Sequence, residues 1–395
     1  MNLHSIFDYL DWRGDISFAL DPLNEVDNLI FSVLSYSDFS GVVPGLDKPG
    51  SVTLQEAADR IGPAPHEVTT NLTRSFFAAL PLLLEKCAQT ERFANLQLSH
   101  YIDRIEFAKA EQFSAIVFSL EENLHFIAFS GTDDTLAGWK EDLEMSFLDA
   151  VPAQRDATRY AQAVMANLSG EFYLGGHSKG GNLAVYAAAH LTSEEQQRII
   201  AVYNNDGPGF LANIIEKEGY QRIIHKVTTF IPQSSVAGIL LEHGEEYRIV
   251  RSSETGLLQH NAFSWEVLGK HFVYEQELSK SSLVLSQAIR AWLDEIPLEQ
   301  RAHFVEALFQ VIEATGAKTL SELSEDKLAA ARAMITTFTQ LEEETQTILK
   351  KVVESFFAES QKILRSSLGE GVGNLVQKTI LRKKSNDPKI GRAHV

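Results

Sequence analysis

The sequence predicts an α/β fold flanked by helical regions on both sides. Between residues 96 and 275, short apolar runs rich in β-forming residues alternate with helix-like segments, which is typical of a sheet covered by helices. Residues 1–95 are mixed and mostly helical in pattern. In residues 276–388 no strand pattern remains, and apolar positions recur at helical spacing among many Glu, Lys and Gln. We therefore expect three regions with these boundaries.

Individual patterns predict the elements of these regions. Apolar spacing predicts helices over Leu23–Tyr36 and Ser51–Ile61. Two apolar runs, 113–120 and 124–129, are separated by Glu-Glu-Asn and predict a hairpin. Further strands are expected at 199–203, 226–231 and 247–251. Further helices are expected at 236–242, 281–293, 298–314, 324–350 and 351–365. The last residues, 389–395, match a translation of a common sequencing-adapter stretch, and we exclude this tail as an artefact of the gene sequence; a genomic stop codon directly after Val395 would contradict that.

Length and composition limit the class of protein. The chain has 395 residues, 44% hydrophobic and 22% charged, so it can bury a sizeable core and should be globular. It has 35 Lys and Arg against 53 Asp and Glu, a formal net charge of −18. Because phosphate backbones and anionic lipid headgroups attract basic proteins, we expect neither nucleic-acid binding nor electrostatic adsorption to membranes.

Cysteine content and the N-terminal sequence bear on location. Cys87 is the only cysteine, which excludes an internal disulfide, and its position after an apolar run favours a buried thiol. The N-terminal stretch lacks the basic and apolar regions of a signal peptide. The longest apolar run, residues 76–84, is well short of the ~20 residues that span a bilayer. These features predict a cytoplasmic protein without a transmembrane segment.

The strongest local signal is the stretch Gly176-His-Ser178-Lys-Gly180. A strand-like run precedes it, and a helix of small and apolar residues, 182–190, follows. This is G-x-S-x-G in the strand–turn–helix context of a nucleophile elbow, although a chance glycine-rich turn is the alternative. The two glycines would let the helix and a neighbouring strand approach closely, and the helix N-terminus would face developing negative charge. Ser178 is therefore the candidate nucleophile.

An oxyanion hole is expected beside this serine. In α/β hydrolases one backbone N–H comes from a loop after an early strand, and another comes from the residue after the nucleophile. Thr132 follows the second strand of the predicted hairpin and Lys179 follows Ser178. We therefore predict that the amides of Thr132 and Lys179 form the hole, with the Lys179 side chain flanking the mouth. Trp139 and Phe147 could line an acyl pocket or pack a lid helix.

These motifs together resemble the class 3 (fungal-type) lipase family, most closely a bacterial branch of unknown function. The resemblance covers residues 98–275 and is carried by Phe-x-Gly-Thr at 129–132, Trp139-Lys-Glu-Asp142 and Gly-His-Ser-x-Gly-Gly at 176–181. It implies an α/β-hydrolase fold, an oxyanion hole at the Gly-Thr turn and a Trp-x-x-Asp segment on or near a lid helix. The chain departs from the family at Ser130, usually Arg, and after the nucleophile, where an apolar residue is usual. These departures bear on triglyceride specificity rather than on acyl transfer.

The catalytic base should be a histidine that follows the elbow helix, because α/β hydrolases carry serine, acid and histidine in that order. His260 lies in a loop after the predicted strand at 247–251, and the family also carries its base on a late loop before an aromatic segment. His225 would lie at the wrong end of the sheet. His260 is therefore the candidate base, with His243 or a purely structural role for His260 as alternatives.

The orienting acid is less constrained by the sequence. Asp206 follows the strand expected after the elbow helix, a position where some α/β hydrolases carry their acid. It could instead simply cap the turn at 207–209. The resemblance implies a carboxylate after the next-to-last strand, where this chain has two serines. Asp206 is the candidate acid, with Ser234 and then Glu242 as alternatives.

The sequence thus predicts a serine hydrolase that cleaves lipid-like or small acyl esters through an acyl-enzyme. No motif for a metal or nucleotide site is present, so we expect no cofactor and no metal. The expected partner is a small-molecule acyl ester or lipid-like substrate. An acyltransferase or thioesterase is an alternative, as is a non-catalytic binding or scaffold protein that kept the fold. Acyl length and oligomeric state are not determined by the sequence.

Overall fold

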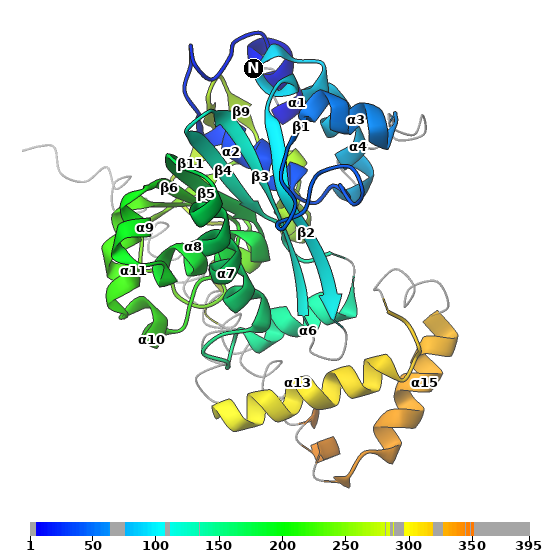
Figure 1. Cartoon of the computed structure of the whole chain (residues 1–395). Helices are drawn as coiled ribbons and strands as arrows, with labels where there is room; N and C mark the ends of the chain where they lie inside the picture. The colour runs from blue at the N-terminus through cyan, green and yellow to red at the C-terminus, as the bar shows by residue number, and fades with distance from the viewer. Residues whose placement is uncertain are drawn as a thin grey trace, which may run out of the picture.

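The core of the protein is a nine-stranded sheet with helices on both faces (Figure 1). The computed structural model describes residues 5–63, 76–106, 111–133, 135–280, 282–284, 287, 296–318, 327–343, 345–347 and 349–350. Within these residues the strand order is β1-β2-β3-β4-β5-β6-β7-β8-β11. Neighbouring strands from β4 to β8 run parallel, and the remaining pairs of this sheet are antiparallel. The predicted α/β fold is confirmed.

The element bounds are as follows. The strands of the large sheet are β1 (Val52–Thr53), β2 (Gln97–Glu106), β3 (Glu111–Glu121), β4 (Leu124–Phe129), β5 (Glu171–His177), β6 (Ile199–Asn205), β7 (Val227–Pro232), β8 (Tyr247–Val250) and β11 (Tyr274–Glu275). A small antiparallel pair consists of β9 (Val267–Leu268) and β10 (His271–Phe272). The α-helices are α1 (Ile6–Arg13), α2 (Glu25–Leu34), α3 (Leu54–Ile61), α4 (Phe76–Ala88), α5 (Glu91–Ala94), α6 (Leu136–Glu144), α7 (Pro152–Asn167), α8 (Lys179–His190), α9 (Ser193–Gln197), α10 (Ala212–Ile215), α11 (Glu218–Ile223), α13 (Leu298–Glu313) and α15 (Lys327–Gln340). The 3₁₀ turns are η3 (Ile224–Lys226), η4 (Ala237–Ile239), η5 (Gly256–His260) and η6 (Ala262–Ser264).

The strands alternate their side chains between two hydrophobic cores. On β3, Ile116 and Phe118 belong to the core beneath the N-terminal helices, whereas Ala115 and Val117 belong to the core beneath α7 and α8. This is the two-residue period of a strand buried on both faces. The N-terminal helices therefore share one core with the sheet.

Several predicted elements appear with shifted ends. The helix expected from residue 23 is α2, which begins after Asn24, because the Asn24 side chain accepts hydrogen bonds from the amides of Val26 and Asp27. The hairpin is formed by β3 and β4 as predicted. Because parallel strands end at a common edge, the segments that follow β4, β5, β6 and β7 meet there.

Two predicted helices were wrong in extent. The helix expected at 236–242 is only the short η4, because the Gly238 amide donates to Asp206 Oδ1 and to Ser235 Oγ instead of entering a helix. The helix expected at 324–350 is interrupted, since α15 ends at Gln340 and the Gln346 side chain bonds the carbonyl of Leu341. The helix expected at 351–365, the tail at 389–395 and most of 281–293 lie outside the described residues.

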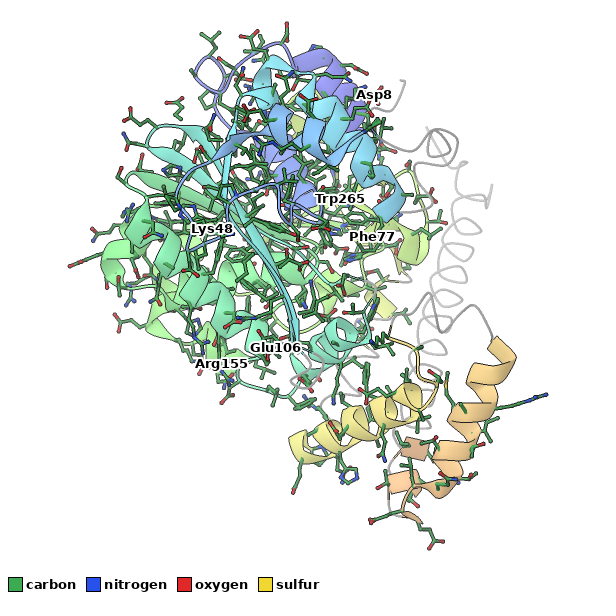
Figure 2. All side chains as sticks on the ribbon, turned by 45° about the vertical axis from the view of Figure 1, so that its right-hand side comes forward. Asp8, Lys48, Phe77, Glu106, Arg155 and Trp265 are labelled. Atoms are coloured by element: carbon green, nitrogen blue, oxygen red, sulfur yellow. The ribbon has the colours of Figure 1, made fainter. Side chains whose placement is uncertain are left out.

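The C-terminal helices contact the rest of the chain at α6. Leu136 of α6 packs with Val305 and Phe309 of α13, and the partly buried Phe147 packs against this cluster. Lys140 of α6 forms an ion pair with the α13 residue Glu306 at 2.9 Å. In the turned view of Figure 2, α13 and α15 stand apart from the main body of the protein. None of the helices in the described residues is long and apolar enough to cross a bilayer.

Candidate active site

Ser178 occupies a strained turn between β5 and α8. Its backbone has φ 57° and ψ −133°, in the positive-φ region that non-glycine residues seldom adopt. A Cβ atom at Gly176 would overlap the backbone of Gly180, and one at Gly180 would overlap the carbonyl oxygen of Phe129. The two glycines therefore let α8 start directly against β4 and β5. This geometry is that of a nucleophile elbow.

Asp206 and His260 lie in contact at the same edge of the sheet. Asp206 directly follows β6, is fully buried and also has a positive φ of 56°. Its Oδ2 lies 2.6 Å from His260 Nδ1. Its Oδ1 accepts hydrogen bonds from the Gly238 amide at 3.1 Å and from the hydroxyl of Ser235. Because Nδ1 contacts the carboxylate, Nε2 is the ring nitrogen that can accept or donate a proton in a reaction.

The alternative acids occupy other positions. The hydroxyl of Ser234 donates to Ser279 at 2.9 Å, and its amide donates to Gln259. Glu242 is exposed at the surface. The neighbouring serine at 235, which the sequence analysis did not single out, contacts Asp206 and not the histidine. Among these candidates, Asp206 is the carboxylate that the structure places on His260.

The alternative histidines, His243 and His225, form no hydrogen bond with Asp206 in the described part of the chain. The side chain of His243 is 5% exposed, with Nε2 2.8 Å from the Gly238 carbonyl oxygen and Nδ1 3.2 Å from Glu245 Oε1. Both ring nitrogens are thus engaged away from the elbow. His225 belongs to η3, directly before β7, and so lies at the opposite end of the strands from Ser178.

The two candidate oxyanion residues flank the elbow. Thr132 follows β4, and its hydroxyl donates to Asp142 Oδ2 at 2.6 Å. Lys179 is the first residue of α8, where backbone amides have no partner within the helix. Desolvation by burial raises the pKa of Asp142 to about 6, although nearby Lys179 acts to lower it. Asp142 Oδ1 is buried and has no hydrogen-bond partner among the described residues.

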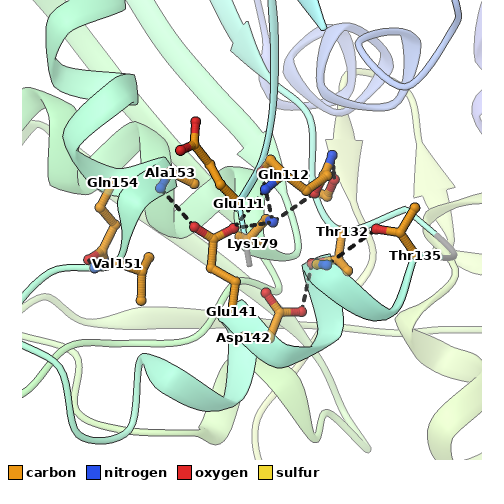
Figure 3. A network of polar contacts seen from close by, with 12 residues as sticks. Glu111, Gln112, Thr132, Thr135, Glu141, Asp142, Val151, Ala153, Gln154 and Lys179 are labelled. Carbon is orange, nitrogen blue, oxygen red and sulfur yellow. Dashed lines mark hydrogen bonds and ion pairs between the residues drawn. The ribbon is translucent and has the colours of Figure 1, made fainter. Parts of the chain in front are cut away.

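The side chain of Lys179 does not flank the mouth of the site, so that prediction was wrong. It is 1% exposed and points into a polar cluster formed by Gln112 and Glu141 (Figure 3). The sequence held one signal for this, because the residues after Lys179, 180–189, are mostly small and apolar, which is typical of a buried helix. On α6, Trp139 is 45% exposed, so its side chain is available at the surface beside this cluster.

His177, which sequence reasoning missed, supports the loop of the candidate base. Burial lowers its pKa well below the usual range, so the ring is neutral. Its Nε2 lies 2.8 Å from the backbone oxygen of His260, which can only accept, so this nitrogen carries the proton. Nδ1 lies 3.2 Å from the hydroxyl of Tyr36. Phe76 of α4 stacks on the same ring.

A cavity of about 510 Å³ lies between α3 and α4. Its apolar wall is formed largely by helix residues, and Tyr36, which bonds the backbone oxygen of His177 at 3.1 Å, is also on its wall. Acidic and amide side chains also line the cavity. The apolar wall residues are Ala58, Ile61, Phe77, Leu80, Pro81, Leu84 and Ala88.

Ser178, Asp206 and His260 follow β5, β6 and β8 of the parallel part of the sheet, so serine, aspartate and histidine occur in the chain order of the α/β hydrolases. The chain belongs to the Mbeg1-like family, whose model matches residues 87–310. Among solved structures it is similar to the crystal structure of M37 lipase, with a TM-score of 0.31 and 14% sequence identity over 54% of this chain and 67% of that chain. None of the curated proteins matches the chain.

Proposed function

We propose that this protein is a serine hydrolase that cleaves carboxylic esters of lipid-like or small acyl groups. The observation that carries the proposal is the 2.6 Å contact between the buried Asp206 and His260, at the edge where the elbow presents Ser178. A buried carboxylate on Nδ1 fixes the orientation of the imidazole and stabilises its cationic form during proton transfer. In a non-catalytic scaffold protein, nothing would require a buried carboxylate to be kept in contact with this histidine.

Each residue has a definite step in the proposed reaction. His260 Nε2 takes the proton of Ser178 Oγ as that oxygen attacks the acyl carbonyl carbon. The negative oxygen of the tetrahedral intermediate accepts hydrogen bonds from the amides of Thr132 and Lys179. The imidazolium then gives its proton to the departing alcohol, which leaves an acyl group on the serine. Water, deprotonated by the same histidine, releases the acid and restores the enzyme.

The cavity beside Tyr36 is our candidate site for the acyl chain, because Tyr36 also contacts His177, the residue before Ser178. Its apolar wall would bury a hydrocarbon chain, and each buried methylene contributes about 0.8 kcal/mol to binding. Its acidic rim, which includes Asp38 and Asp59, disfavours a second anionic group at that end. We therefore expect neutral esters of medium-length acids to be better substrates than acetate esters.

A fluorophosphonate probe tests the proposal directly, because it phosphonylates an activated serine. We expect labelling of the wild-type protein, none for Ser178→Ala, and a loss of about 10³-fold or more in labelling rate for His260→Ala. Asp206→Asn should reduce p-nitrophenyl ester turnover by up to about 10⁴-fold. The proposal would be refuted by labelling that persists in Ser178→Ala, or by absence of labelling in folded wild-type protein.

A further inference from the structure

The buried side chain of Lys179 takes no part in the proposed proton transfers, yet it is held by a complete set of acceptors. Its Nζ lies 3.0 Å from Glu141 Oε2, 3.0 Å from the carbonyl oxygen of Gln112 and 2.7 Å from Gln112 Oε1 (Figure 3). An ammonium group has three donors, and all three have an oxygen here. Burying a charge is costly unless it is paired and hydrogen-bonded, so this cluster holds the lysine in one position.

Glu141 connects the lysine to three further segments. Its own backbone belongs to α6, its Oε1 accepts from the amide of Ala153 at 2.8 Å, and its Oε2 also accepts from the amide of Gln112 at 3.3 Å. Ala153 lies in the first turn of α7, and Gln112 lies at the start of β3. The ion pair therefore joins the first residue of α8 to α6, α7 and β3 at one buried point.

The same point links the two candidate oxyanion donors. One donor is the amide of Lys179 itself. The other belongs to Thr132, whose hydroxyl is held by Asp142, the residue after Glu141 on α6. A continuous path thus runs from Lys179 through Glu141 and Asp142 to Thr132.

We propose that Lys179 is a positioning residue that fixes the spacing of the two oxyanion donors by tying the start of α8 to α6. This inference rests on the hydrolase function proposed above. Oxyanion donors act by being in place before charge develops, and a misplacement of about 1 Å can lower a rate ~10²-fold. The side chain thereby acts on the transition state without touching the substrate.

Lys179→Met tests the inference, because methionine keeps much of the length and volume while removing the charge and its three donors. Active sites are first counted by fluorophosphonate titration, so that turnover is expressed per reactive serine. We expect this turnover to fall about 10- to 100-fold with KM changed less than ~3-fold. The affinity for a trifluoromethyl ketone, which forms an oxyanion on the serine, should fall by the same factor as kcat/KM. Lys179→Arg, which keeps the charge, should recover part of the loss.

A double variant separates positioning from stability. Lys179→Met leaves the charge of Glu141 buried and unpaired, which by itself destabilises the fold. In Lys179→Met combined with Glu141→Gln both charges are gone, and the glutamine oxygen can still accept from the Ala153 amide. We expect the melting temperature to recover in the double variant while the turnover per serine stays low.

A second buried ion pair provides the matched control. Arg92 and Asp27 are both fully buried and 2.6 Å apart, on α5 and α2. Arg92→Met should lower stability and leave turnover per titrated serine unchanged. Wild-type turnover in Lys179→Met, or its return in the double variant, would overturn the inference alone. Folded wild-type protein without Ser178-dependent labelling would overturn the proposed function and the inference with it.

Discussion

At the scale of single residues, the candidate site depends on how many hydrogen-bond donors each buried carboxylate has. Asp206 keeps hydrogen-bond donors on both oxygens, namely His260, the Gly238 amide and the Ser235 hydroxyl. Asp142 has the Thr132 hydroxyl on one buried oxygen and no partner among the described residues on the other. The two buried carboxylates thus differ in how fully their oxygens are hydrogen-bonded.

The raised pKa of Asp142 predicts a pH-dependent stability. Because the folded protein binds this proton more tightly than the unfolded chain does, ionisation destabilises the fold progressively from about pH 4 to pH 6 and fully above that range. Asp142→Asn removes the buried charge while keeping an acceptor for Thr132. Relative to wild type, the free energy of unfolding of this variant should therefore gain on the order of 1–3 kcal/mol between pH 4 and pH 8. Urea denaturation at both pH values measures it.

Asp21 provides a control of opposite sign. Burial acts to raise its pKa, but hydrogen bonds from Lys270 and Arg13 outweigh burial and lower it. Its ionised form therefore stabilises the fold above the pKa of the unfolded carboxyl group, and this contribution is lost as pH falls. Asp21→Asn should lose stability relative to wild type at pH 8 and less at pH 4. A pH-independent difference for Asp142→Asn would contradict the assignment of its shift.

Much of the candidate site could be predicted from residue order, and the rest depended on contacts between distant segments. Ser178 and His260 could be named as candidates because strand, turn and loop signals are local in the chain. The contact of Ser235 with Asp206 and the pairing of Lys179 with Glu141 join residues that are 29 and 38 positions apart, and no local pattern encodes such a distance. His177 was missed as a support for the base because its partner is a backbone oxygen, which carries no sequence signal.

At the scale of elements, the elbow requires α8 to begin in direct contact with β4. The strand and helix patterns around it were read correctly, since β4, β5 and α8 are short, buried and strongly apolar. The extent of η4 was misjudged because the hydrogen bond from the Gly238 amide to Asp206 competes with helix formation. The ends of elements are thus least predictable where side chains accept the hydrogen bonds that backbone amides would otherwise donate within a helix.

Gly180→Ala tests this close approach. The added methyl group would overlap the carbonyl oxygen of Phe129, so α8 and β4 must separate. We expect a loss of about 1–3 kcal/mol in the free energy of unfolding, together with slower fluorophosphonate labelling. Gly45→Ala is a suitable control, because there the methyl group would lie at an ordinary 3.5 Å from Tyr101 and should leave both measurements nearly unchanged. Equal effects of the two substitutions would argue against a tight elbow.

At the scale of the whole molecule, α6 stands between the sheet and the C-terminal helices (Figure 1). It contacts Lys179 of the elbow through Glu141 and Thr132 through Asp142. It contacts α13 through Leu136 and the ion pair of Lys140. The two sets of contacts lie on one short helix. The C-terminal helices therefore pack directly on the element that carries the supports of the candidate oxyanion hole.

This arrangement predicts that weakening the α6–α13 contact loosens α6 selectively. Phe309 is buried against Leu136, and Phe309→Ala removes most of the apolar contact between the two helices. We expect the amides of α6 to exchange with deuterium at least ~10-fold faster, because their protection depends on packing against α13. Amides of β5 and β6 should keep wild-type exchange rates, because these central strands are protected by their neighbouring strands and not by α13. Leu20→Ala, at a side chain that is 80% exposed, serves as the control. Unchanged exchange in α6, or equal acceleration throughout the sheet, would show that the C-terminal helices do not hold α6 in place.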